Sequence, residues 1–134
     1  MNTITDSPYY TFAEEVTDAL LNKELLLVAL GAAEGTVKLA TSLDDAIGVL
    51  HEKQEGNPHV NVRLLGKGGT VKLIAGGVIA KGARVTWGAG AKVVTLSAAA
   101  GTYRTVGVKL SQGNSAANDV IEVLDTVETR IVTE

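Results

Sequence analysis

Two stretches of the sequence share one pattern: VALGAAEGTVKL at residues 28–39 and VTWGAGAKVVTL at residues 85–96. In each stretch a short apolar run stops at a glycine-containing turn, and a second apolar run follows, as in two short strands joined by a turn. Ile47-Gly48-Val49 follows the first stretch, and Val106-Gly107-Val108 follows the second at nearly the same spacing. The chain therefore predicts a body built from two diverged copies of one strand pattern.

The repeat extends beyond these two stretches. The run VNVRLL at residues 60–65 has its counterpart in VIEVL at residues 120–124. The two copies are expected to cover about residues 25–76 and 82–132, and the glycine-rich segment at residues 75–87 is expected to carry the chain from one copy to the other. The small differences in spacing fall in turns, where insertions are tolerated.

The glycines inside the repeated strands indicate an architectural role. A glycine in a strand weakens it and is kept where a bulge forms, a barrel bends or another backbone comes close. Gly48 and Gly107 occupy equivalent places between β-branched neighbours. Trp87 is expected to plug one end of the core, with its indole N–H bonded to a polar partner at the edge.

Short apolar runs separated by turn residues continue along the whole body. This texture predicts an all-β fold, either a small barrel or a sandwich. No long amphipathic helical pattern interrupts the runs, so a parallel sheet with crossover helices is not expected. The expected strands are residues 25–30, 36–40, 46–50, 60–65, 70–75, 84–87, 92–96, 105–110, 120–124 and 129–132.

The first 24 residues differ from the body, which is assigned to residues 25–134. Residues 1–11 read as an extended polar arm, although its tyrosines could instead fold back onto their own domain. Residues 12–23 predict either one short helix, with Thr11 and Glu14 as a capping box, or an irregular lead into the first strand. Exposed aromatic groups suit a docking segment. The expected partner contacts are Pro8, Tyr9, Tyr10 and Phe12.

Composition excludes several classes of function. The 134 residues are 46% hydrophobic but only 4% aromatic, so Val, Leu, Ile and Ala must build the core. The net charge of −3 and the scattered basic residues do not indicate nucleic-acid binding. The chain has no cysteine, which removes disulfides and thiolate sites. The polar start predicts no secretory signal, and no apolar run is long enough to suggest a membrane span.

A search for catalytic, metal or cofactor sites yields weak candidates. His51 and His59 lack metal-site spacing and read as part of a charged loop. Asp44-Asp45 is absent from the second copy and fits a turn. Lys67 and Lys81 lie in glycine-containing turns, which match the modified lysine of a lipoyl or biotinyl carrier domain poorly. No catalytic residue, metal ligand, cofactor or enzymatic activity is therefore expected.

Several motifs together resemble the capsid decoration (cement) proteins of tailed bacteriophages. The resemblance rests on the order of small apolar and glycine residues over about residues 25–125. The segments that carry it are GTVKLATSLDDAIGVL, VNVRLLGKGGTVKLIAGGVIAKGARVTW, AGTYRTVGVKL and NDVIEVL.

The resemblance implies a structural virion protein that binds the outer surface of a capsid and stabilises the shell. Its implied partners are the major capsid protein and further copies of itself, typically in a trimer. Its implied place is the capsid exterior after synthesis in the bacterial cytoplasm. The alternatives are a head fibre base or a tail protein, both of them non-enzymatic.

Overall fold

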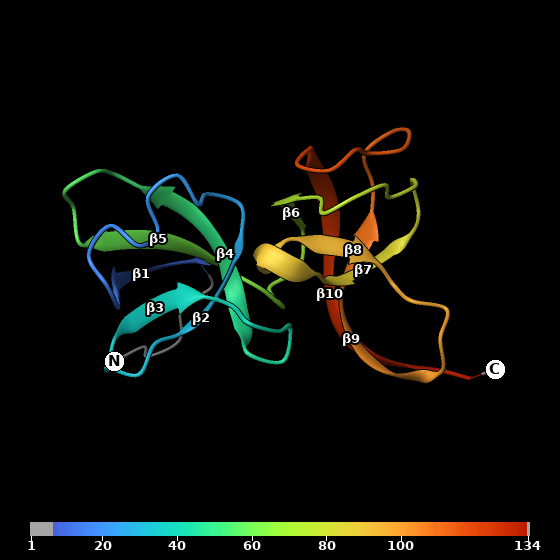
Figure 1. The fold of residues 1–134 in the computed structure, drawn as a ribbon, viewed down its shortest axis with the longest axis horizontal. Helices are drawn as coiled ribbons and strands as arrows, with labels where there is room; N and C mark the ends of the chain where they lie inside the picture. Colours follow the sequence, from blue (N-terminus) through green and yellow to red (C-terminus); the bar gives the residue numbers. More distant parts are fainter. Residues whose placement is uncertain (1–6, 134) are drawn as a thin grey trace.

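The computed structural model describes residues 7–133, which form two five-stranded units joined by a short linker at residues 65–69 (Figure 1). The first unit is a closed barrel in which the strands follow the order β1-β3-β2-β4-β5. Its strands are β1 (Tyr9–Glu14), β2 (Leu27–Leu30), β3 (Thr36–Leu39), β4 (Ala46–Lys53) and β5 (His59–Leu64). The all-β prediction is confirmed.

The second unit is a sheet with the order β6-β10-β9-β7-β8. A short 3₁₀ turn, η1 (Ala89–Ala91), connects β7 to β8. The two last strands expected from sequence, 120–124 and 129–132, are one continuous strand of 13 residues, because a bulge lets the chain bend without leaving the sheet. The strands are β6 (Thr70–Ile74), β7 (Arg84–Trp87), β8 (Val93–Thr95), β9 (Gly101–Lys109) and β10 (Val120–Val132).

The two strand orders correspond one to one. Starting from β3, the strand order of the barrel is β3-β2-β4-β5-β1, and starting from β8, the order of the second unit is β8-β7-β9-β10-β6. Strands at the same position in the two orders correspond, so the halves repeat in topology as well as in sequence. The correspondence pairs β1 with β6, each lying antiparallel beside the last strand of its unit. In this correspondence β6 takes the place in the second unit that β1 takes in the first, whereas the sequence repeat assigned residues 70–76 to the first copy.

Gly48 and Gly107 lie at equivalent bulges. The register between β2 and β4 shifts after the pair Val28–Gly48, and the register between β7 and β9 shifts after Val85–Gly107. A β-carbon added to Gly48 would lie 2.5 Å from the carbonyl oxygen of Arg63. The neighbouring strand thus comes too close for a side chain at this point of each copy.

Of the alternatives left open for the start of the chain, the described residues show the tyrosines folded back onto their own domain and no helix at residues 15–22. Tyr9 to Ala13 pair with β5, so this segment is a barrel strand, while residues 1–6 of the expected arm lie outside the described residues. Residues 15–22 form turns instead of a helix. The Glu14 carboxylate accepts hydrogen bonds from the N–H groups of Asp18 and Leu20, which holds the turn in place of a helical cap.

The apolar core has two parts. One cluster fills the barrel, and its buried members are Leu20, Val28, Val37, Leu50, Val60 and Val62. The other combines the interior of the second unit with side chains on the outside of the barrel, such as Leu27 and Val49. The two units therefore share buried surface and form one body. No helix among the described residues is long and apolar enough to cross a membrane.

Candidate contact surface

The side chains of β1 alternate between the barrel interior and its outer surface. Phe12 packs against the barrel cluster, and the Tyr10 ring lies 4.8 Å from the Phe12 ring while remaining 53% exposed. Tyr9 points the other way, as expected for neighbouring residues of a strand. The pairing of β1 with β5 therefore divides the predicted aromatic contacts. Phe12 belongs to the core, and Tyr9 and Tyr10 stay accessible.

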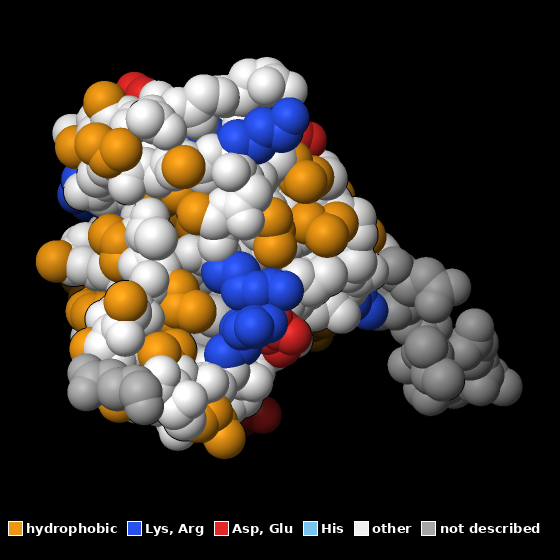
Figure 2. All heavy atoms as spheres, turned by 90° about the vertical axis from the view of Figure 1, so that its right-hand side faces the viewer, with side chains coloured by type: hydrophobic (Ala, Val, Ile, Leu, Met, Phe, Trp, Pro, Cys, Tyr) orange, Lys and Arg blue, Asp and Glu red, His pale blue; other side chains and the backbone are white. Residues whose placement is uncertain are grey.

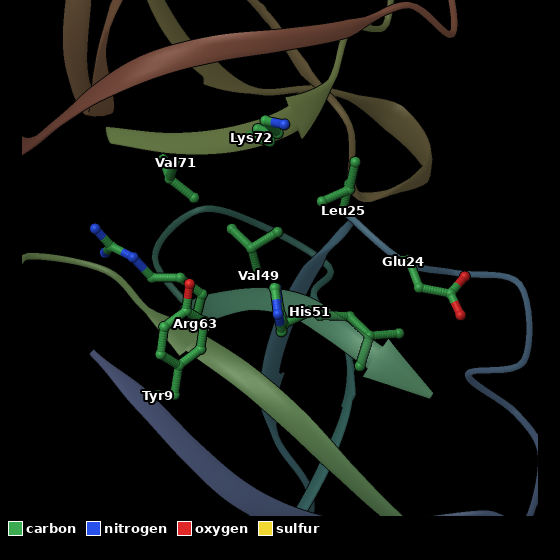
Figure 3. Close-up of a pocket in the computed structure, with 9 residues that line it drawn as sticks. Tyr9, Glu24, Leu25, Val49, His51, Arg63, Val71 and Lys72 are labelled. Atoms are coloured by element: carbon green, nitrogen blue, oxygen red, sulfur yellow. The ribbon is translucent and has the colours of Figure 1, made fainter. Parts of the chain in front are cut away.

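Tyr9 lines a cleft between the two units (Figure 3). Its ring lies 4.8 Å from the His51 ring, which projects from β4. The cleft has a volume of about 480 Å³, with apolar walls and a few charged groups. Its lining residues are Tyr9, Glu24, Leu25, Val49, Leu50, His51, Arg63, Val71 and Lys72. A cleft of this size could receive one or two side chains of a partner protein.

An ion pair at one end of the cleft fixes the two units relative to each other. Arg63 of β5 contacts Asp125 of β10, with 2.6 Å between Nη1 and Oδ2, and both side chains are buried. The Asp125 carboxylate also accepts hydrogen bonds from the N–H groups of Gly66 and Lys67. Arg63 donates a further hydrogen bond to the Gly68 carbonyl. Backbone groups of the linker therefore bond both members of the ion pair.

A second charge cluster lies where β1 and β4 end, with Lys53 and Glu14 buried and Asp18 partly exposed. Lys53 Nζ lies 2.8 Å from Glu14 and 2.9 Å from Asp18, and it donates to the Asn57 carbonyl. Burial disfavours the charged form of Glu14, but the bonds from Lys53 and from the backbone outweigh it and lower the Glu14 pKa. Burial likewise opposes the charge on Lys53, yet Glu14 and Asp18 raise its pKa. These shifts reflect structural ion pairs that stabilise the charged forms.

The remaining candidates for chemistry are scattered. His51 and His59 line different hollows, so they do not form a common site. Asp45 accepts a hydrogen bond from the Thr41 hydroxyl, which is a turn role. Lys81 lies in a turn and contacts Gln112. Among residues 7–133, no group of three or more His, Asp or Glu side chains could hold a metal ion.

Trp87 packs against the core cluster of the second unit while remaining partly exposed. Its indole nitrogen is buried and has no hydrogen-bond partner in the described part of the chain. The expected polar partner is therefore not found there.

Sequence reasoning missed the cleft and the Arg63–Asp125 pair. The two residues are 62 positions apart in sequence. Arg63 lies inside the repeated run VNVRLL, and Asp125 directly follows its counterpart VIEVL. One signal was available, because Arg63 and Asp125 are charged residues within or directly after apolar runs of the repeat. An unmatched charge at a strand position expected to be buried indicates a buried partner elsewhere.

No family model matches the chain, and no curated protein matches it. Among solved structures, it is similar to the N base of the head fibre protein gp8.5 of bacteriophage phi29. The TM-score is 0.58, and the match covers 88% of this chain and 92% of that chain at 15% identity. At this identity the likeness shows a shared fold across nearly the whole length of both chains.

Proposed function

We propose that this protein is a non-enzymatic structural component of a phage virion and that it binds the outer surface of the capsid. The observation that carries the proposal is the fold likeness to a phage head fibre base over 88% of the chain. The motif resemblance to capsid decoration proteins supports the same role from an independent direction. Both lines concern proteins of the phage particle surface.

The geometry suits a binding module. The described residues form two apolar clusters, two buried ion pairs and a cleft between the two units. The shifted pKa values of Glu14 and Lys53 come from an ion pair that stabilises the barrel. Tyr9 lines this cleft, and Tyr10 presents an exposed ring on the same strand. Aromatic side chains with a polar tip are enriched at protein interfaces because they add contact area at low entropic cost.

The test is binding to capsids of the encoding phage that have been prepared without this protein. A decoration protein should cosediment with these capsids and raise their melting temperature. Since many copies bind one particle, several weak contacts per oligomer suffice for stable attachment. Purified protein that neither cosediments nor changes capsid stability would contradict the proposal.

A head fibre base is the second candidate, and the structural likeness favours it. The two candidates differ in where and how densely they occupy the shell. A decoration protein is expected at many equivalent positions and should stabilise the shell. A fibre base is expected to anchor a projecting fibre and to leave the capsid melting temperature nearly unchanged. Particle imaging with and without the protein separates them.

The contact residues are best tested by substitution. Deleting the predicted contact residues 8–12 would destroy β1, because Tyr9 to Ala13 pair with β5. Tyr10→Ser removes an exposed ring and should weaken capsid binding about tenfold if that ring fills a pocket on the partner. Val78→Ser is the matched control, since Val78 is 70% exposed in the second unit. Equal binding by both variants would remove Tyr10 from the proposed contact surface.

A further inference from the structure

The end of β10 carries an open strand edge. β6 pairs with β10 only from Val120 to Leu124, and no other strand within residues 7–133 pairs with this side of β10 beyond that point. From residue 128 to residue 132, β10 pairs only with β9. The two strands form a ribbon that projects from the second unit, with the C-terminus at its end (Figure 1). Open edges of this kind can accept another strand.

The opposite edge of the ribbon is engaged at Arg104. The Arg104 carbonyl of β9 accepts a hydrogen bond from the Thr86 hydroxyl, and Arg104 also donates to the Leu43 carbonyl of the barrel. The Tyr103 hydroxyl donates to the Ala99 carbonyl. The outer side of β9 is therefore occupied at Arg104, whereas no strand within residues 7–133 covers the open side of β10 from residue 128 to residue 132.

Backbone orientation identifies the groups that this edge offers. The Thr105 hydroxyl lies 3.4 Å from the Glu128 carbonyl, so that carbonyl faces β9. The Arg104 carbonyl opposite Thr129 faces away from β10, as expected for a non-hydrogen-bonded pair. Since orientation alternates along a strand, Val127, Thr129 and Ile131 direct their N–H and C=O groups to the open side.

The sequence at this edge is complementary to itself when read in the opposite direction. If Thr129 faces Thr129 of a second copy in an antiparallel pair, Glu128 faces Arg130 and Val127 faces Ile131, each of them twice. Opposite charges and β-branched pairs across strands both stabilise a sheet. This register also places the open N–H and C=O groups face to face, which allows about six backbone hydrogen bonds.

Surface exposure agrees with such a partner. Ile131 is 75% exposed, the highest value among the large apolar side chains of residues 7–133. Glu128 contacts both Arg84 and Arg130, so two guanidinium groups share one carboxylate and one cation is in excess. Figure 2 views the molecule from the side of the second unit and shows basic side chains gathered beside an acidic one, with hydrophobic side chains around them. A second copy would cover Ile131 and bring a second carboxylate to Arg130.

We propose that the open edge of β10 binds the same edge of a second copy of this chain, antiparallel and with Thr129 on the two-fold axis. The contact is isologous, so it joins copies in pairs. Natural edge strands are usually protected by prolines or by charges that prevent pairing. Here no proline is present, and the two charges specify one register instead. A trimer of the kind that the motif resemblance implies would need a different surface.

Charge exchange tests the register. Wild-type protein should dimerise with increasing concentration in analytical ultracentrifugation. Arg130→Glu places like charges opposite each other and should weaken dimerisation at least tenfold, and Glu128→Arg should do the same. An equimolar mixture of the two variants should form a heterodimer, because each supplies the charges that the other lacks. Lys38→Glu, which changes an exposed charge on β3 of the barrel, should dimerise like the wild type.

Cysteine cross-linking tests the axis, because the natural chain contains no cysteine. Thr129→Cys should form a covalent dimer under mild oxidation, since facing residues of an antiparallel pair lie within disulfide reach. Thr126→Cys is the matched control, because it would face Val132 and not another Thr126.

A monomer at all concentrations, a trimer, or equal cross-linking of both cysteine variants would overturn the inference. Capsid cosedimentation of Arg130→Glu, measured separately, distinguishes loss of self-association from failure of the proposed virion role.

Discussion

The barrel and the second unit share one strand order, but they differ in how they close and in what completes their cores. In the barrel, β1 and β3 pair in parallel at two positions and close the wall around a separate cluster. In the second unit, a single bridge between Ala75 and Val93 joins the corresponding edges. Its interior belongs to a cluster that includes the outer face of the barrel. The first copy is thus self-contained, while the second depends on the first.

The two buried ion pairs also lie in different places relative to the two units. The ion pair between Glu14 and Lys53 lies in the barrel unit, with both side chains buried. The pair between Arg63 and Asp125 lies where the two units meet. Breaking a buried pair from one side is costly because the remaining charge stays unpaired. The Arg63–Asp125 pair therefore couples the two units, whereas the Glu14–Lys53 pair acts within the barrel.

The largest expected effect comes from the repeated glycines. A β-carbon at Gly107 would overlap the carbonyl oxygen of Leu124 and lie 2.9 Å from its carbonyl carbon. Since both atoms are backbone, relief requires the strands to separate, and Gly107→Ala should cost about 4 kcal/mol of unfolding free energy. Gly48→Ala meets Arg63 O at 2.5 Å and should cost about 2 kcal/mol. Urea denaturation measures both.

Gly77→Ala is the control for this comparison. Nothing lies within 4 Å of a β-carbon added at Gly77, so the change should stay within about 0.5 kcal/mol. If Gly107→Ala is tolerated as well as Gly77→Ala, then the close approach of β9 and β10 does not constrain the fold.

The next largest effect concerns the barrel ion pair. Lys53→Met keeps most of the side-chain volume but leaves Glu14 buried without its cation, which should cost about 3 kcal/mol. The double variant Lys53→Met/Glu14→Gln removes both charges and should recover much of that loss. Thermal and urea unfolding provide the measurement. Equal stability of the single and double variants would show that the cost comes from lost packing and not from an unpaired charge.

Much of this architecture could be predicted from the sequence, because the repeat consists of features that neighbouring residues determine. Turn glycines, β-branched runs and the two glycine-centred strands each depend only on neighbouring residues. The pairing of β1 could not be predicted in this way, since its partner strand begins 45 residues after β1 ends, at His59. The turn of residues 15–22 depends on Glu14, whose pairing with Lys53 is also distant in sequence. A local helical pattern was therefore overridden by long-range strand pairing.

Acid should loosen the barrel before the second unit. Burial raises the pKa of Glu14, but hydrogen bonds from Lys53 and the backbone outweigh it, so this pKa lies below its ordinary value of 4.5. The hydrogen bond from Lys53 also lowers the pKa of Asp18 below 3.8. Their stabilising contribution is therefore complete above these values and is lost as pH falls through the lower folded-state pKa values. Hydrogen exchange at decreasing pH should show protection falling first in β1 and β4. Glu14→Gln should remove much of this pH dependence, whereas earlier loss in β7 and β9 would contradict it.

The smallest expected change in stability concerns a position at which the two copies carry different residues. Trp87 of β7 corresponds to Leu30 of β2 by the 57-residue offset between the copies, and its buried indole N–H has no partner among residues 7–133. Trp87→Phe removes this donor while keeping an aromatic ring, so lost contact area and relieved desolvation nearly cancel. The unfolding free energy should change by less than about 1 kcal/mol. A loss near 3 kcal/mol would instead mean that the whole indole is needed to fill the end of the second unit, as a self-contained core would require.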